Sequence, residues 1–337
     1  MKICLGVLAH NEETNIAATL GDLIKQDLWR CPEHHPGLLV VVNGSTDRTA
    51  DLARQILSGS GISHEVVELT VAGKANAWNR FVHELSPADA DVLILADADI
   101  RLPQSDALRR LVQALTEHPE AFAAVDQPVK DIALHTDQGL RGRLSVAASA
   151  LANSGPISLC GQLYAARATP LRRIFLPEPM LVEDGFIRAM LLTEGFSKPE
   201  DIGRLVRAEG VYHIFEAEMR ATTVFRHEKR ILIGTVSNLL LFDQARALAG
   251  DGVAVGDWLR ARTQEDPDWF RKLIRERLGN WGGPRIGVMI PVPLGQLRQM
   301  RGAAFWRAVP GAAARVALNL VVAAGAAIDL RLGRLRW

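Results

Sequence analysis

The chain has 337 residues, of which 48% are hydrophobic and 23% charged, proportions that are ordinary for a packed globular protein. This length allows one large α/β domain with an extension, or two domains. Cys4, Cys31 and Cys160 are scattered without metal-ligand spacing, which excludes a cysteine metal site and favours a reducing compartment. The apolar run in the first segment, MKICLGVLAHNEE, is too short for a signal peptide.

The net charge of +1 is distributed unevenly along the chain. Between Trp269 and Trp337 there are twelve Arg and Lys residues and two acidic ones, a net charge of +10 that leaves −9 for the preceding part. A basic, tryptophan-bearing segment on an acidic body predicts a polyanionic partner surface, and both anionic lipid and nucleic acid fit that description.

The chain begins with two predicted strand–helix units. Residues 2–9 and 38–42 are apolar strands, and helices are predicted around 16–24 and over 49–57. A short polar loop follows each strand, so the units predict a parallel sheet that carries these loops at the carboxyl ends of its strands.

The loop after the second strand, residues 43–47, is rich in turn-forming residues. Asn43 would lie at the mouth of the sheet, where its amide suits the edge of a nucleotide base. Asp47 is expected to cap the next helix. The alternative is that the whole loop is turn chemistry.

A third strand is predicted at 63–69, and a helix opens at Lys74. A lysine at a helix start is electrostatically unfavourable unless an anion is bound nearby, so Lys74 is a candidate for contact with a phosphate or carboxylate. The alternative is a solvated lysine.

The fourth strand, 92–96, is wholly apolar and leads into Asp97 and Asp99. Residues two apart in an extended chain point to the same side, so both carboxylates would project from the carboxyl end of the strand, where open α/β sheets bind ligands. Two close carboxylates favour a cation, and oxygen ligands suit Mg²⁺ or Mn²⁺. The alternative is a strand that ends in a polar turn.

The next elements are predicted more briefly, as a helix at 103–115, strands at 121–125 and 159–167, and an apolar helix at 139–151 that carries Arg141 and Arg143. Within the second of these strands, Gly161 and Gln162 indicate a backbone that another group approaches closely.

A helix is predicted at 185–192, directly after Glu183 and Asp184. Acids in this position commonly cap the helix, but within a cleft such an acid can also serve as a general base. A polar loop at 196–209 and a strand at 211–216 are expected next. Arg226 and Arg230 then lie four apart on one helical face, where they could hold a diphosphate or form a solvated basic surface.

The C-terminal segment contains two apolar stretches. Residues 286–297 are broken by glycine and proline, and 316–328 are shorter than the ~20 residues that span a bilayer. Trp306 and Arg307 precede the second stretch, and it is followed by a basic, tryptophan-ended sequence (Arg331, Arg334, Arg336, Trp337). We expect a helix lying in a membrane interface, with a packed helix or a transmembrane span as alternatives.

The ordered set of motifs resembles the family 2 glycosyltransferases, which have the GT-A fold. The resemblance covers residues 1–240 and rests on LAHNEETNI, VVVNGSTDRTADLA, GKANAWN, LILADADI, GQLYAAR, VEDGFI and FRHEKR. It implies an α/β fold with a Rossmann-like, mostly parallel sheet, divided into a nucleotide-sugar-binding half (1–125) and an acceptor half (126–240). Residues 241–337 would form a basic, helical, membrane-associating extension.

The resemblance also implies roles for individual residues. Ala9, Glu12 and Asn43 would contact the base, although the family usually has an aspartate where this chain has Asn43, so a UDP-sugar is favoured and a GDP-sugar stays open. Lys74 and Asp97 would face the nucleotide and ribose, and Asp99, with Asp97, the metal. The remaining roles are Asp184 as catalytic base, Arg226 and Arg230 on the donor diphosphate, and Gly161, Gln162 and Glu183 on the sugar or acceptor. Ile231 stands where the family's arginine motif ends in tryptophan, which weakens the case for processive polymer synthesis.

The expected activity is inverting, metal-dependent transfer of a sugar from a nucleoside-diphosphate sugar to a lipid or lipid-linked acceptor at the cytoplasmic face of a membrane, without a nucleic-acid partner. Two rivals stay open. A sugar-phosphate nucleotidyltransferase shares the α/β core and metal, but its glycine-rich basic loop after the first strand is missing. A non-catalytic nucleotide-binding subunit would not need Asp97, Asp99 and Asp184.

Overall fold

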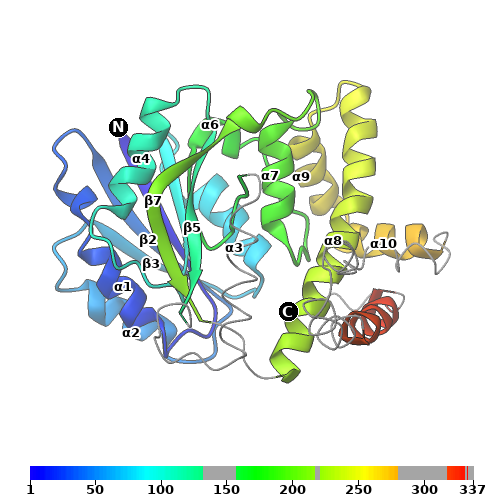
Figure 1. Ribbon diagram of the computed structural model, residues 1–337, viewed down its shortest axis with the longest axis horizontal. Helices are drawn as coiled ribbons and strands as arrows, with labels where there is room; N and C mark the ends of the chain where they lie inside the picture. Colours follow the sequence, from blue (N-terminus) through cyan, green and yellow to red (C-terminus); the bar gives the residue numbers. More distant parts are fainter. Residues whose placement is uncertain (132–156, 217–220, 280–316, 331, 333–337) are drawn as a thin grey trace, which may run out of the picture. The chain divides into compact units, whose positions relative to one another are not determined.

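The computed structural model describes residues 1–131, 157–216, 221–279, 317–330 and 332 (Figure 1). The chain separates into two compact units. The first consists of Met1–Pro177, Glu183–Ala217 and Ala245–Ala261, and the second of Glu178–Val182, Glu218–Gln244 and Arg262–Trp337. The domain boundary that we expect at residue 240 stays a prediction.

The first unit is built on a seven-stranded sheet with the order β3-β2-β1-β4-β6-β5-β7. Its strands are β1 Lys2–Ala9, β2 His35–Asn43, β3 His64–Leu69, β4 Val92–Asp97, β5 Ala123–Lys130, β6 Leu163–Arg167 and β7 Leu205–Phe215. β6 runs antiparallel to both β4 and β5, and the other pairs are parallel. The predicted mostly parallel α/β sheet is therefore confirmed.

Helices flank this sheet or follow it. They are α1 Ile16–Ile24, α2 Thr49–Leu57, α3 Lys74–Arg80, α4 Ala107–Glu117, the single turn α6 Ala168–Leu171, α7 Glu183–Leu192, α8 Ala221–Gly250, α9 Val255–Glu265 and α10 Trp269–Gly279. A further helix, Ala317–Leu330, lies in the second unit.

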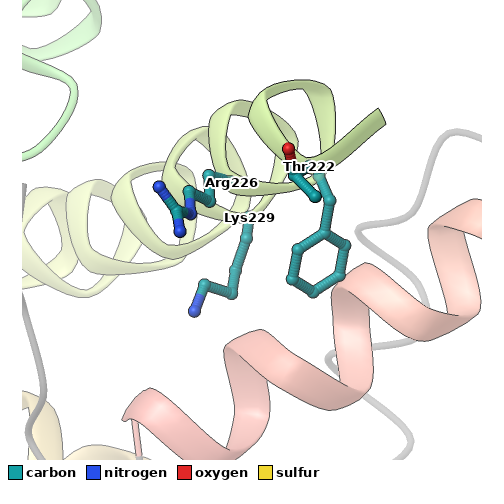
Figure 2. Close-up of a pocket in the computed structure, with 4 residues that line it drawn as sticks. Thr222, Arg226 and Lys229 are labelled. Atoms are coloured by element: carbon teal, nitrogen blue, oxygen red, sulfur yellow. The ribbon is translucent and has the colours of Figure 1, made fainter. Parts of the chain in front are cut away.

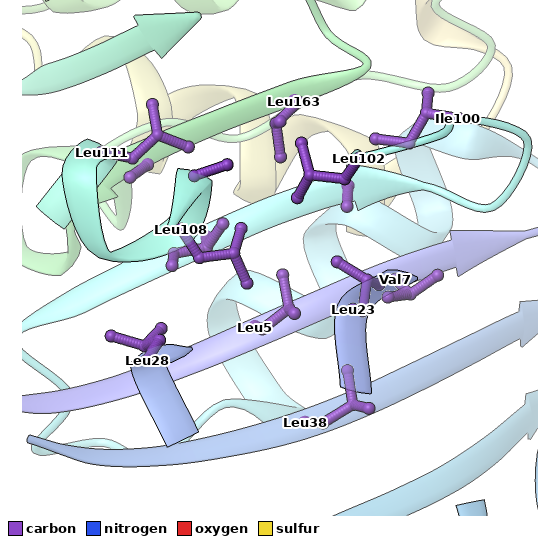
Figure 3. Packing of buried hydrophobic residues seen from close by; sticks show 14 of the residues in the cluster. Leu5, Val7, Leu23, Leu28, Leu38, Ile100, Leu102, Leu108, Leu111 and Leu163 are labelled. Carbon is purple, nitrogen blue, oxygen red and sulfur yellow. The ribbon is translucent and has the colours of Figure 1, made fainter. Parts of the chain in front are cut away.

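The main hydrophobic core lies between one face of the sheet and helices α1, α2 and α4. Figure 3 shows part of it, with Leu5 and Val7 of β1, Leu23 of α1 and Leu108 of α4. Alternate residues of β1 reach this core, and the intervening residues Cys4 and Leu8 are buried on the other face. Both faces of the central strands are covered, which explains why their sequences are apolar without alternation.

Helix α3 and the turn after it cover the second face. A Cβ added at Gly6 of β1 would lie 2.5 Å from the ring of Phe81, so glycine lets this ring lie against the strand. Next to it, Trp78 Nε1 donates to the hydroxyl of the buried Tyr164 on β6, at 2.7 Å. These contacts fix α3, and with it Lys74, against the centre of the sheet.

The predicted bounds of β1 and α2 are confirmed, but two other predictions need correction. The loop expected over 196–209 is wrong for its last five residues, because β7 begins at Leu205 and pairs with β5. β7 is an edge strand with exposed Glu209 and Gly210, and its polarity resembles that of a loop. The strand expected over 159–167 begins only at Leu163, so Gly161 and Gln162 lie in the turn before it.

Within the described residues, one helix is long and apolar enough to cross a membrane by length and composition, Thr222–Gly250 of α8. Half of its most apolar window is buried inside the protein, a property that it shares with ordinary core helices. Several sequence predictions lie outside the described residues, namely the helix at 139–151 with Arg141 and Arg143, the stretch 286–297, and Trp306, Arg307, Arg331, Arg334, Arg336 and Trp337.

Candidate active site

The carboxyl ends of β1, β2 and β4 lie side by side, with Ala9 opposite Val42 and Leu8 opposite Asp97. Asn43 ties the loops at this edge together. Its Nδ2 donates to the carbonyl of Ala9 at 2.9 Å, and its Oδ1 accepts from the backbone N–H of Gly73 at 2.9 Å. The side chain is buried, so Asn43 has a structural role here, and its contact with a base stays a prediction.

The two polar loops after β1 and β2 also brace each other. The backbone N–H of Glu12 donates to Thr49 Oγ1 at 2.8 Å, and that of Glu13 donates to Asp47 at 3.0 Å. Asp47 also accepts from the N–H of Thr49, at the start of α2, at 3.0 Å. These bonds hold Glu12 at the edge of the sheet where the ligand is expected.

Lys74 is the central cation of the site. Its ammonium lies 2.7 Å from Asp97 Oδ2 and 2.9 Å from Glu183 Oε1, and these three side chains come from the starts of α3 and α7 and the end of β4. Burial alone would lower the pKa of Lys74, but the charges of Asp97 and Glu183 raise it well above the usual value. The solvated lysine is thus excluded, and the anion near this helix start is a carboxylate pair of the same chain.

The two aspartates at the end of β4 have different surroundings. Burial raises the pKa of Asp97 to about 6, with Lys74 opposing the rise and Asp99 adding to it. Asp99 is exposed and forms no hydrogen bond or ion pair with the described part of the chain. The pKa of Glu12 is raised by burial and by the charges of Asp99 and Asp97, so negative charge is concentrated at this edge.

The residues present fit a hard divalent cation, because Asp97 and Asp99 offer only oxygen ligands in an electronegative environment. Among the described residues no group of three or more His, Cys, Asp or Glu side chains is arranged to hold a metal. A cation here would therefore take further ligands from water and from substrate phosphates, as Mg²⁺ usually does.

Asp184 begins α7 next to Glu183, and its pKa is raised by burial and by the neighbouring charge of Glu183. Hydrogen bonds from the backbone N–H groups of Gly185 and Gly161, together with the charge of Lys74, oppose this rise. A carboxylate whose pKa is raised toward neutrality is suited to accept a proton.

Gly161 is where the elements of the site approach most closely. A Cβ at this position would lie 3.0 Å from Glu183 Oε1, 3.4 Å from Asp184 Cβ and 3.7 Å from Lys74 Nζ. The close approach predicted at Gly161 therefore involves side chains of this chain, and its contact with a sugar or acceptor stays a prediction.

A buried polar network is linked to the site through the backbone of Asp97, and the sequence analysis did not predict it. His213 Nδ1 contacts Asp126 Oδ2 at 2.7 Å, its Nε2 contacts Gln162 Oε1 at 3.2 Å, and the carbonyl of Gln162 accepts from the N–H of Asp97 at 2.8 Å. Burial alone would lower the pKa of His213, but hydrogen bonds to Asp126 and Cys160 raise it to about 10. His213 is then an imidazolium that donates from both nitrogens. The only signals in the sequence are polar residues within two short apolar strands.

We expect this network to contribute to stability in a pH-dependent way. The pKa of His213 in the folded protein lies above the ordinary value of 6.5, so the stabilisation by its pairing is complete below about pH 6.5. This stabilisation is lost as the pH rises through about 10. His213→Leu leaves Asp126 buried and unpaired, so denaturant unfolding at neutral pH should show a loss of about 3–5 kcal/mol. His118→Leu, which removes an exposed pair with Glu120, is the control and should change stability by less than about 1 kcal/mol. A wild-type unfolding free energy that does not change between pH 7 and 10 would contradict the assignment.

Arg226 and Arg230 belong to α8 in the second unit. Arg226 lines a depression of about 380 Å³ together with Thr222, Phe225 and Lys229 (Figure 2). Lys74, Asp97 and Asp184 belong to the first unit, so contact between the two arginines and a donor diphosphate stays a prediction.

Comparisons with known proteins agree with this geometry. Residues 4–162 match the sequence model of the family described as glycosyl transferase family 2. No curated protein matches the sequence significantly. Among solved structures, the chain is similar to mannosyltransferase PcManGT from Pyrobaculum calidifontis, which was solved in complex with GDP-Man and Mn²⁺. The TM-score is 0.56 and the sequence identity 19%, and the alignment covers 97% of this chain and 86% of PcManGT. S. aureus TarS 1–349 in complex with UDP-GlcNAc has a TM-score of 0.49 and 15% identity, covering 99% of this chain and 93% of its own.

The family match covers most of β1, all of β2 to β5 and the turn before β6, and therefore includes Lys74, Asp97 and Asp99. The structure of PcManGT extends the similarity of fold over 97% of the chain. The chain thus has a GT-A fold, and its residues 4–162 match glycosyl transferase family 2.

Proposed function

We propose that the chain transfers a sugar from a nucleoside-diphosphate sugar to an acceptor hydroxyl, with inversion at the anomeric carbon. The observation that carries this proposal is the cluster of Lys74, Asp97 and Glu183 directly beside Asp184. This cluster supports the proposal because it brings Asp97, the carboxylate that we propose for the donor side, close to Asp184, the proposed base.

In the proposed reaction the chain's own residues hold the donor and move one proton. Glu12 and the loops braced by Asn43 would position the nucleoside, and Arg226 and Arg230 would neutralise its diphosphate. Asp184 would take the proton of the acceptor hydroxyl as that oxygen attacks the anomeric carbon. Asp97 and Asp99 would hold Mn²⁺ or Mg²⁺, which supplies positive charge that stabilises the departing diphosphate.

For the acceptor we propose a lipid or a lipid-linked glycan at the cytoplasmic face of a membrane. The support is the net charge of +10 between Trp269 and Trp337, a segment that contains the apolar helix Ala317–Leu330. For the donor, a UDP-sugar and a GDP-sugar both stay open. The neighbour solved with GDP-Man and Mn²⁺ supports testing a guanosine donor first.

A thermal-shift panel of GDP, UDP and their sugar conjugates, with and without Mn²⁺, tests the donor and metal parts. A ligand that binds only the folded state raises the apparent stability, by about 2.7 kcal/mol at 100 times its Kd. We expect one nucleoside diphosphate to raise the Tm, to do so more strongly with Mn²⁺, and to lose the metal-dependent part in Asp99→Asn. Asp51→Asn, at an exposed aspartate of α2, is the matched control and should behave like the wild type.

Two outcomes would overturn the proposal. A shift that is independent of metal in the wild type would remove the role of Asp97 and Asp99. Release of pyrophosphate from a nucleoside triphosphate would instead favour the nucleotidyltransferase.

A further inference from the structure

Helix 317–330 of the second unit has two apolar faces, and among the residues that the structure describes one face is buried and the other is exposed. Its inward face is buried, with Val322, Ala326 and Leu330 between 0% and 4% exposed. The opposite face carries Leu320, Val321, Ala324 and Ile328, which we call the apolar ridge. The three larger side chains of the ridge are 57–61% exposed, and they recur at the spacing of one helical face.

The inward face is held against α8 by specific contacts within the second unit. Lys229 Nζ pairs with Asp329 Oδ2 at 2.5 Å, and a Cβ at Gly325 would lie 3.3 Å from the ring of Phe225. Figure 2 shows Lys229 and the neighbouring ring on the side of α8 that faces this helix. The helix is therefore anchored in one orientation, and its exposed ridge is a fixed surface of the unit.

Charge decides which partner fits the ridge. Arg275 and Arg277 of α10, in the same unit, are exposed, whereas Lys272 beside them pairs with Asp266 at 2.7 Å, and as a sequence the segment Trp269–Trp337 carries a net charge of +10. A second copy of the chain, placed ridge to ridge, would bring the same cations opposite one another. A nucleic acid would satisfy the charge but would leave Leu320, Val321 and Ile328 in water.

An anionic bilayer satisfies both features, because it accepts apolar side chains at the level of the acyl chains and attracts cations at its headgroups. We propose that helix 317–330 lies in the interface of an anionic membrane, with the apolar ridge inserted and the basic residues at the headgroups. The inference rests on the membrane-face acceptor of the proposed function and deepens it, because it assigns the membrane contact to a defined surface of the second unit.

Flotation of the full chain with lipid vesicles tests this inference. We expect the wild type to float with vesicles of phosphatidylcholine and phosphatidylglycerol and to remain in solution with phosphatidylcholine alone. Leu320→Asp/Ile328→Asp should weaken binding by at least about tenfold, because each carboxylate would have to enter the interface. The control is Ile202→Asp, at an apolar residue of the first unit that is 45% exposed, and it should bind as the wild type does.

The thermal shift produced by the nucleoside diphosphate shows whether the double variant is folded, and size-exclusion chromatography with light scattering gives its oligomeric state. Vesicle binding by the double variant equal to that of the wild type would overturn the inference. A wild-type dimer that dissociates in the double variant, without floating on vesicles, would assign the ridge to a second copy. If the wild type does not float with vesicles but a nucleoside diphosphate still raises its Tm, only this inference is rejected. If the wild type floats but no nucleoside diphosphate raises its Tm, only the proposed function is rejected.

Discussion

Asp184→Asn should lower kcat by about 10²–10⁴-fold while leaving the binding of the nucleoside diphosphate unchanged, because general-base catalysis contributes an effect of this size. The substitution preserves shape and hydrogen bonding to Gly185 but removes the group that accepts the proton. Initial rates at saturating donor give kcat, and the nucleotide-induced thermal shift gives donor binding.

Two further variants make this result specific to the base. Glu183→Gln alters the adjacent residue and breaks its pair with Lys74, yet keeps Asp184 ionisable, so we expect a smaller loss than in Asp184→Asn. Asp51→Asn serves again as the surface control. An Asp184→Asn variant as active as the wild type would contradict the role, and would fit a phosphate acceptor, which needs no base.

Lys74→Met should lower kcat/KM by about 10²-fold or more, since the ammonium fixes carboxylates on two elements in a site with little water. It should also move the pH dependence. The pKa of Asp97 is about 6 with Lys74 in place, so wild-type kcat/KM should fall as the pH drops through about 6. Lys74 holds this pKa down, so in Lys74→Met the fall should occur at a higher pH. Both profiles are measured at one fixed metal concentration, because metal and protons compete for the carboxylate.

Lys198→Met provides the matched control, because Lys198 also pairs with a glutamate, Glu194 at 2.9 Å, but is 59% exposed. Exposed pairs contribute about 0–1 kcal/mol, so its activity and pH profile should equal those of the wild type. If Lys74→Met lowered the rate without moving the pH profile, the contact between Lys74 and Asp97 would not set the ionisation of that aspartate.

The structure changes the interpretation of Lys74 in a specific way. The sequence analysis assigns it to a ligand anion, because a lysine at a helix start lacks a favourable local partner. The structure provides two partners from distant segments, Asp97 and Glu183, 23 and 109 positions along the chain. The positive charge of Lys74 therefore compensates the negative charges of these two carboxylates. If Lys74 also bound a substrate phosphate, its charge would be shared between the phosphate and the carboxylates.

The local pattern of apolar and polar residues was sufficient to predict those strands in which nearly every residue is buried. The strands β1 and β4 are buried on both faces, so uninterrupted apolar runs predict them, and Asp97 and Asp99 follow directly from where β4 ends. The order of the motifs predicts the GT-A fold, and the mostly parallel sheet together with the similarity to the structure of PcManGT confirms it.

Local pattern failed where pairing with a distant strand determines the structure. β7 mixes buried, half-buried and exposed residues at the edge of the sheet without regular alternation, and its pairing with β5 shows that Leu205–Glu209 are not a loop. The antiparallel direction of β6 is also set by its neighbours, because strand sequence carries little information about direction.

The sequence by itself determined the fold class, the metal-binding candidates and the base candidate, because these depend on residue type and on position relative to a strand or helix end. Only the tertiary structure decided that Lys74 is shared by two carboxylates, that Asn43 braces two loops and that His213 pairs with Asp126. Each of these contacts joins residues 23 to 109 positions apart. Their energies depend on burial and on distances of about 3 Å, which arise only when the sheet brings its strand ends together.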